Sequence, residues 1–119
     1  MTKNNFPKQG EIWLLKNHER IREISKDCRP VLIFSSNERN EHGNSVVVFP
    51  LTTDDLENIL PVEVYIKNTT ENGLDYPSKI LCDCPFTWDK RIRFEKRLGK
   101  VSIEVMEEVK KALKITFDL

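Results

Sequence analysis

CRPVLIF (residues 28–34) is the stretch that decides the fold, because one arginine and one proline directly precede four consecutive bulky apolar residues. Two of these four, Val31 and Ile33, are β-branched, so the run predicts a short strand that is covered on both faces. A proline holds the residue before it in an extended conformation, and Arg29 should therefore enter this strand in a fixed direction. A guanidinium group held in this way presents a planar fork of donors that suits a phosphate; pairing with a carboxylate at the strand edge is the alternative.

Short apolar or alternating runs on both sides of this stretch predict further strands, each bounded by turn residues. Pro50 is expected to break or end the strand before it. The run after it, residues 62–67, alternates strictly and predicts a half-exposed antiparallel strand. Besides residues 30–34, the predicted strands are residues 11–15, 45–49, 62–67 and 79–82, with two more strand pieces between residues 86 and 101.

The connections are expected to be polar loops. Residues 1–9 predict a flexible tail of a single domain that spans residues 1–119. Residues 16–27 carry ten polar side chains out of twelve and predict a mobile loop, with one helical turn as the alternative. Residues 35–44 are expected to form a turn-rich connection.

The end of the chain predicts a helix. Ser102 can cap it, and apolar residues recur there at spacings of three and four, at Val105, Met106, Val109, Ala112 and Leu113. Acidic residues come early in this segment and lysines late, as the helix dipole favours. Several short strands followed by one helix predict a mainly β fold, a small curved sheet or barrel with a helix packed over it.

The composition excludes several classes of protein. The 119 residues carry a formal net charge of zero, so no general basic bias indicates nucleic-acid binding, although a local basic face remains possible. The longest apolar runs have four or five residues, which predicts no membrane span, no signal peptide and a cytosolic location. Cys28, Cys82 and Cys84 lack the spacing of a zinc site and are interpreted as reduced thiols. No metal or cofactor is expected.

The candidate catalytic residues are polar side chains at strand ends: Arg29, Thr52 with Thr53, and Asp83. An arginine can neutralise a developing phosphorane, a threonine hydroxyl can bind a non-bridging oxygen, and a carboxylate can accept a proton from a hydroxyl. This set suits metal-free cleavage of RNA, where the adjacent 2′-OH is the nucleophile. The spacing of these residues is not by itself specific.

Several segments together resemble the MazF/PemK (Kid) family of bacterial toxin endoribonucleases. The similarity extends from about Gly10 to the C-terminal helix. The segments that carry it are GEIWL (10–14), RPVLI (29–33), LT (51–52), LPVEV (60–64), CDCP (82–85) and TWDK (87–90).

The resemblance implies a small SH3-like barrel with a helix, of the CcdB-like type, and roles for particular residues. Arg29 matches the catalytic arginine of the family, and Thr52 matches the residue that contacts the scissile phosphate. Asp83 matches the general base of the PemK/Kid branch. The segment with Gly10, Glu11 and Trp13 is interpreted as structural.

This chain departs from the Kid branch at two positions. Leu81 and Phe86 stand where that branch has arginines, and both changes remove positive charge. His18 lies in the loop where that branch has a functional histidine, although an alignment without gaps puts Glu23 there. Arg29 is therefore expected to stabilise charge, and which residue acts as the general acid stays open.

A basic run near the end of the predicted sheet completes the expected site. Its cations could follow an RNA backbone while an aromatic ring stacks on a base, or the run could be a solvated strand face. The predicted RNA-binding residues are Thr53, Trp88, Arg91, Arg93, Lys96 and His18, with Arg97 and Phe94 nearby.

The implied function is the toxin of a type II toxin-antitoxin system. The resemblance implies a homodimer that cleaves single-stranded RNA at specific sequences, leaving 2′,3′-cyclic phosphate and 5′-hydroxyl ends, and that is masked by a cognate antitoxin. Two alternatives stay open: a gyrase-inhibiting, CcdB-like protein and a non-catalytic binding module on the same fold. Neither the RNA sequence that is recognised nor the antitoxin follows from the chain.

Overall fold

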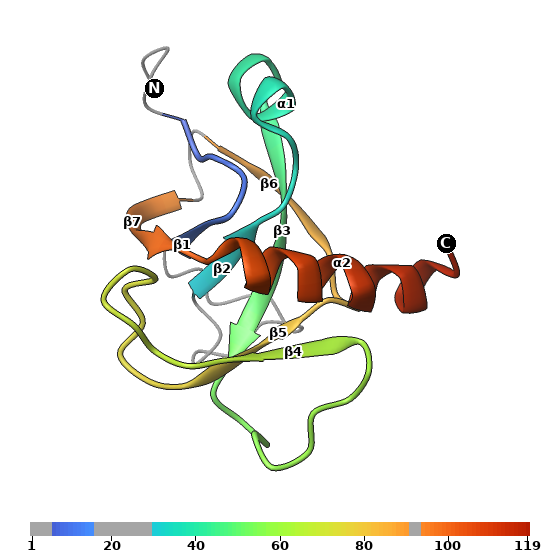
Figure 1. Ribbon diagram of the computed structural model, residues 1–119. Helices are drawn as coiled ribbons and strands as arrows, with labels where there is room; N and C mark the ends of the chain where they lie inside the picture. Colours follow the sequence, from blue (N-terminus) through green and yellow to red (C-terminus); the bar gives the residue numbers. More distant parts are fainter. Residues whose placement is uncertain (1–5, 16–29, 91–93) are drawn as a thin grey trace.

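The computed structural model describes residues 6–15, 30–90 and 94–119, which form seven strands and two helices (Figure 1). The strand prediction is confirmed at each expected place, with small shifts at the ends. The elements are β1 (Glu11–Leu15), β2 (Pro30–Ile33), α1 (Asn37–His42), β3 (Ser45–Thr52), β4 (Glu63–Ile66), β5 (Ser78–Leu81), β6 (Phe86–Asp89), β7 (Phe94–Lys100) and α2 (Ile103–Phe117).

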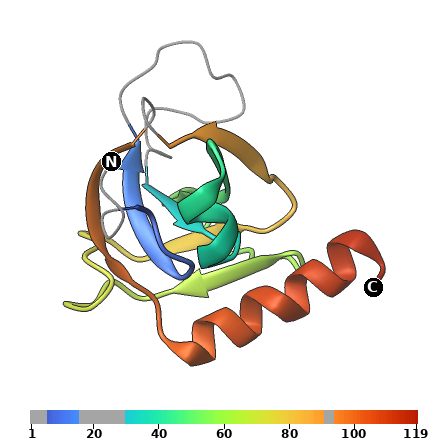
Figure 2. The ribbon, with the colours of Figure 1, turned by 90° about the horizontal axis from the view of Figure 1, so that it is seen from above.

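The strands pair antiparallel in the order β4-β5-β3-β2-β1-β7, and β6 pairs with β3. Figure 2 shows the sheet curving around a central space while α2 lies along one side, where it packs against β4. The predicted fold class, mainly β with a C-terminal helix, is confirmed. The sheet is not a closed barrel, because in the described ranges β4 and β7 pair with β5 and β1 but not with each other.

β3 is longer than expected, and the prediction that Pro50 breaks or ends this strand was wrong. One edge of β3 pairs with β2, with Val31 opposite Pro50. The other edge changes partner at the proline: β6 pairs up to Val48, and β5 pairs from Leu51 onward. Pro50 lacks a backbone N–H, and it lies between the two ladders on that edge, so the strand continues through it.

β2 is covered on both faces, as its apolar run predicts. Val31, Leu32 and Ile33 are each 0% exposed. Leu32 belongs to the larger core, which also includes Phe49 of β3. Val31 and Ile33 belong to a second core on the opposite face, built mainly from β1, β3, β6 and β7. Alternate side chains of one strand therefore connect the two cores.

α2 confirms the predicted helix and its cap. The Ser102 hydroxyl accepts a hydrogen bond from the Val105 N–H at 3.1 Å. Val109, Ala112 and Leu113 are buried against the larger core, and Val105 and Met106 are packed at its edge. Of the helices in the described ranges, none is long and apolar enough to cross a membrane.

α1 replaces part of the expected turn-rich connection. This six-residue helix has no apolar face, and its one buried residue is Asn40. The Asn40 side chain donates to the Ser35 carbonyl at 2.9 Å, and the buried Lys90 ammonium donates to the Glu41 carbonyl at 2.8 Å. Distant polar partners therefore stabilise α1, and no local hydrophobic period reveals it.

The end of the expected flexible tail is ordered. Pro7 is fully buried, and the Gln9 backbone N–H donates to the Asn37 side chain at 2.7 Å. Tertiary contacts therefore hold residues 6–9, although this segment is polar in sequence. Residues 1–5 and the predicted loop of residues 16–27 lie outside the described residues.

The loop after β4 reaches the other end of the strand order. A Cβ on Gly73 would lie 2.0 Å from the Leu98 carbonyl oxygen, and one on Gly99 would lie 2.1 Å from the Glu71 carbonyl oxygen. The Lys100 N–H donates to that Glu71 oxygen at 2.8 Å. We call this contact between residues 71–73 and 98–100 the glycine clasp. It joins the β4 end of the sheet to β7 without strand pairing.

Candidate active site

A cavity of about 340 Å³ is lined by two of the predicted RNA-binding residues, Thr53 and Lys96. Its lining comes from β1, β2, β7, the residue after β3 and the segment that leads into β5. The described lining residues are Leu14, Pro30, Thr53, Gly73, Leu74, Asp75, Tyr76, Ser78, Lys96 and Leu98.

The pairing of the strands explains why these residues meet. β2 and β3 run antiparallel with Val31 opposite Pro50, so the start of β2 and the end of β3 share one end of the sheet. Lys96 of β7 lies opposite Leu14 of β1, next to β2 in the sheet. The structure thus brings together Thr53, Lys96 and Pro30, the residue that follows Arg29 in the chain. Arg29 itself lies outside the described residues.

Thr52 and Thr53 have different surroundings. Thr52 is buried, pairs with Lys79 of β5, and accepts a hydrogen bond from the Asp54 N–H on its hydroxyl oxygen at 3.0 Å. That hydroxyl keeps its own hydrogen available as a donor. Thr53 is exposed and lines the cavity. One threonine shapes the turn after β3, and the other faces the cavity.

Asp83 lies apart from this cavity. It is exposed in the turn between β5 and β6, where the Cys84 thiol donates to its carboxylate at 3.6 Å. Ser78, at the start of β5, lines the cavity. The strand is about 10 Å long, and Asp83 comes after its opposite end. The described lining residues of the cavity do not include Asp83.

The predicted RNA-binding residues are dispersed. Lys96 is exposed at the cavity, whereas Arg91, Arg93 and His18 lie outside the described residues. Trp88 is 8% exposed and stacks on Phe86 in the second core, with 5.5 Å between the ring centroids. This placement does not fit the stacking on a base that we expected of Trp88, because its ring faces inward from β6.

Phe94 and Arg97 also make contacts within the fold. Phe94 is buried in the second core. The Arg97 Nε donates to the Glu11 carboxylate at 2.6 Å. Of the basic run in its described part, Lys96 is therefore the cation that the structure presents to the cavity.

Glu11 explains the structural role expected of the opening segment. Its Oε1 accepts hydrogen bonds from the Lys8 N–H at 2.8 Å and from the Trp13 indole at 2.9 Å. Burial raises the pKa of Glu11. These hydrogen bonds and the Arg97 guanidinium together lower the pKa by more than burial raises it, so the pKa lies below its ordinary value. The carboxylate therefore stays ionised and fixes β1 to β7.

Lys79 is the residue that the sequence reasoning missed. Its buried ammonium lies 3.0 Å from the Glu63 carboxylate and donates to the carbonyls of Asp55 and Asn58 at 3.0 and 3.1 Å. These bonds fix the loop that directly follows Thr53. A lysine within the apolar run of β5, opposite a strand that contains a glutamate, is the pattern that could have revealed this role.

Cys82 is excluded as a nucleophile. Burial, together with the charges of Asp83 and Glu63, raises the pKa of its thiol to about 12, so the thiol stays protonated. Within the described ranges, no group of three His, Cys, Asp or Glu side chains is arranged to hold a metal ion.

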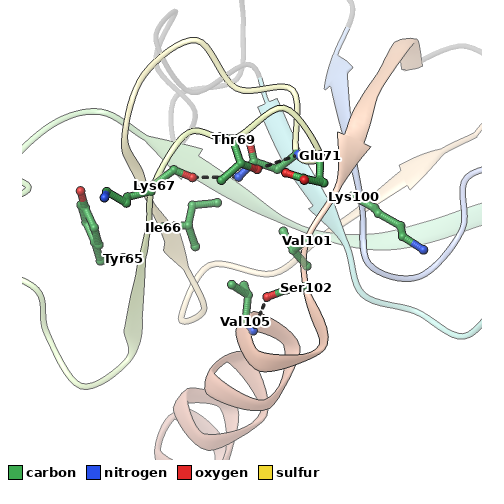
Figure 3. Close-up of a pocket in the computed structure, with 10 residues that line it drawn as sticks. Tyr65, Ile66, Lys67, Thr69, Glu71, Lys100, Val101, Ser102 and Val105 are labelled. Atoms are coloured by element: carbon green, nitrogen blue, oxygen red, sulfur yellow. Dashed lines mark hydrogen bonds between the residues drawn. The ribbon is translucent and has the colours of Figure 1, made fainter.

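A second cavity, of about 520 Å³, lies between the end of β4 and the first turn of α2 (Figure 3). Its surface is mainly apolar, with Ile66, Val101 and Val105 facing it, and Tyr65 lies at its side. None of the predicted site residues is among its described lining residues. The cavity beside Thr53 is therefore the candidate active site.

The fold and this cavity define a small, mainly β protein that offers hydroxyl groups and a cation to a ligand at the ends of its strands. The model of the protein family described as "PemK-like, MazF-like toxin of type II toxin-antitoxin system" matches residues 8–117. The chain therefore belongs to this toxin family, and the resemblance inferred from its segments is confirmed.

Similar proteins support this assignment. Endoribonuclease PemK of Escherichia coli is 30% identical over 101 residues, which cover 85% of this chain and 74% of that protein. A solved structure of an endoribonuclease with its cognate antitoxin, from Mycobacterial species, has a TM-score of 0.75 at 24% identity and covers 95% of this chain and 96% of that one. MazF of Deinococcus radiodurans has a TM-score of 0.78 at 20% identity, covering 97% and 99%. These two structures share the fold.

Proposed function

We propose that this chain is an endoribonuclease that cleaves single-stranded RNA without a metal ion, through attack of the 2′-OH on the adjacent phosphate. The observation that carries the proposal is the cavity at which Thr53, Lys96 and the start of β2 meet, in a chain of the PemK/MazF toxin family. Such a reaction needs a positioned phosphate and proton transfer, and it needs no protein nucleophile.

Each candidate residue has a role in this reaction. Arg29 neutralises the negative charge that develops on the phosphate, and the Thr52 hydroxyl donates to a non-bridging oxygen. Lys96 binds an adjacent phosphate at the cavity. The family resemblance implies that Asp83 is the general base; because its carboxylate lies apart from the cavity, this role requires bound RNA to bring the 2′-OH within hydrogen-bond reach of it. As the bond from the 2′-oxygen to phosphorus forms, the bond to the 5′-oxygen breaks, and the general base takes the 2′-OH proton. A general acid or water protonates the leaving 5′-oxygen, which gives a 2′,3′-cyclic phosphate and a 5′-hydroxyl.

The packing around Phe86 bears on the missing family arginines. Phe86 stacks on Trp88, and Leu81 is half-buried at the end of β5. Apolar packing occupies both positions, so any charge stabilisation has to come from other cations. This assigns a greater share of catalysis to Arg29 than in the Kid branch.

The proposed partners are a second copy of the chain and a cognate antitoxin. Large apolar side chains are exposed at the C-terminal end of α2, at Ile115, Phe117 and Leu119. Such a patch supports a protein interface. The complex of a similar endoribonuclease with its antitoxin supports the second partner. The antitoxin would block RNA by folding onto the toxin.

The test is cleavage of a long single-stranded RNA by the purified protein in EDTA, beside Arg29→Ala and the control Arg39→Ala. Arg39 is exposed on α1, where it donates to the Ser45 hydroxyl at 3.3 Å. We expect discrete cuts with cyclic-phosphate and 5′-hydroxyl ends from the wild type and from Arg39→Ala, and none from Arg29→Ala.

Intact RNA from a folded wild-type protein would overturn the proposal and direct the work to gyrase inhibition and antitoxin binding. Equal cleavage by Arg29→Ala would overturn the assigned role of Arg29. Cleavage that requires added Mg²⁺ would contradict the metal-free mechanism.

A further inference from the structure

Tyr76 is the one aromatic residue among the described residues that line the candidate active site. Its side chain is 69% exposed, in the segment that leads into β5. A ring in this position presents a π-face to any chain that crosses the cavity. The buried rings of Trp88 and Phe94 cannot offer such a face.

The backbone that carries this ring is held in place. The buried Ser78 hydroxyl donates to the Tyr76 carbonyl at 3.2 Å, and Pro77 restricts Tyr76 to an extended conformation. Upstream, Leu74 is buried, and its N–H donates to the Asn72 side chain at 3.0 Å. The glycine clasp fixes the same segment to β7. The ring is therefore presented from an ordered support, which lowers the entropy lost on binding.

The charges at the cavity show why such a ring matters. Lys96 is cationic and Asp75 is anionic, and both line the cavity. Among the described lining residues these two charges cancel, so they give little net attraction for an RNA backbone. Contacts with bases would add affinity that these two charges do not supply, and stacking on an aromatic ring is a sequence-tolerant contact of this kind.

We propose that Tyr76 is a stacking platform for one base of the RNA next to the phosphate that is cleaved. The inference deepens the proposed function and rests on it. The phenol ring binds the base face, Lys96 binds the flanking phosphate, and Thr53 lines the same cavity. Tyr76 is a positioning residue for RNA and takes no part in proton transfer.

The two tyrosines of the chain provide a matched experiment. Tyr65 is also exposed, by 45%, but it lines the second cavity, beside α2 (Figure 3). We would compare wild type with Tyr76→Ala, Tyr76→Phe and Tyr65→Ala. The substrate is an oligonucleotide around a mapped cut site, and its 2′-O-methyl form, which cannot react, gives the dissociation constant.

Loss of one base stack weakens binding by roughly 5- to 150-fold. We expect Tyr76→Ala to raise KM and the dissociation constant within that range while kcat changes less than about threefold. Tyr76→Phe keeps the ring, so its KM and dissociation constant should stay within about twofold of the wild-type values. Tyr65→Ala should also stay within about twofold, because it removes no ring from the candidate active site. Circular dichroism would confirm that all variants are folded.

Wild-type binding by Tyr76→Ala would overturn the inference, as would a loss in Tyr76→Phe equal to that in Tyr76→Ala, which would assign the effect to the hydroxyl group. An equal loss of RNA affinity in Tyr65→Ala would show that the effect is not specific to the cavity beside Thr53. If the wild type cleaves RNA and only Tyr76 proves neutral, the proposed function stands and the inference falls. If the wild type neither binds nor cleaves RNA, both fall.

Discussion

The β4–β5 end and the β1–β7 end of the sheet are each held by an ion pair, but both partners are buried at the first end and only the anion is buried at the second. At the β4–β5 end, Lys79 and Glu63 are 6% and 9% exposed and lie 3.0 Å apart. The remaining donors of the ammonium reach the carbonyls of Asp55 and Asn58. This pair therefore attaches the loop after Thr53 to the sheet.

At the β1–β7 end the anion is buried. The Glu11 side chain is 11% exposed, whereas its partner Arg97 is 48% exposed. The remaining lone pairs of the carboxylate accept from the Lys8 N–H and the Trp13 indole. In both places the buried ion is satisfied by groups besides its partner, as desolvation requires. The difference teaches that the further hydrogen bonds of the buried ion determine which segment of chain is fixed: the loop after Thr53 at one end and the start of β1 at the other.

The largest effect is expected at the β4–β5 end. Lys79→Met leaves the Glu63 carboxylate buried without its cation, and breaking a buried pair in this way costs about 3–5 kcal/mol of unfolding free energy. Urea denaturation measures the loss, and the exposed Lys67→Met is the control, expected within about 0.5 kcal/mol of wild type. A loss below about 1 kcal/mol would show that Glu63 finds another cation or water.

A double variant sharpens the same comparison. Lys79→Met with Glu63→Leu removes both charges, and apolar replacement of a buried pair is often close to neutral. We expect it to recover about 2 kcal/mol of the single-variant loss, short of wild type because the Asp55 and Asn58 carbonyls lose their donor. No recovery in the same urea series would mean that the loop contacts, and not the unpaired charge, dominate.

The β1–β7 end is expected to respond to pH. Glu11→Gln removes a charged acceptor and should cost about 1.5–3 kcal/mol at pH 7. The pKa of Glu11 is lower in the folded protein than its ordinary value of 4.5, so its stabilisation is present above pH 4.5 and is lost as pH falls through the folded pKa. Denaturation midpoints from pH 7 to pH 3 should therefore converge for wild type and Glu11→Gln. Parallel curves would contradict this.

The smallest effect is expected from Arg97→Met. The arginine is half exposed, and Glu11 keeps its two other donors, so the loss should stay below about 1 kcal/mol. Thermal denaturation at low and high salt measures it, and added salt should narrow the difference from wild type. A loss as great as that of Lys79→Met would break the contrast between the two ends.

Local patterns predicted most of the fold because most elements bury apolar residues at a regular period. β2 and α2 are examples: the run from Val31 to Ile33 is buried on both faces, and Val109, Ala112 and Leu113 form the buried face of the helix. β3 ran on past Pro50 because the missing N–H falls between two partner strands, which only the pairing reveals.

The candidate site was less predictable because tertiary contacts create it. Thr53 and Lys96 are 43 positions apart, and only the strand order brings them to one cavity. Trp88 could face either side of β6 by sequence, and the second core determines that it faces inward. The roles of Arg29, Thr52 and Asp83 remain predictions. Lys79 was missed because its partners come from a loop without a pattern.

The glycine clasp bears on how readily the protein aggregates. An unpaired strand edge is a template on which another chain can add a strand, and curved open sheets are exposed to this hazard. Here residues 71–73 lie against residues 98–100, and the Lys100 N–H is already bonded to Glu71. The β7 end is thus partly occupied by the chain's own loop. A side chain at Gly73 or Gly99 would displace that loop, and we expect such variants to aggregate before they unfold.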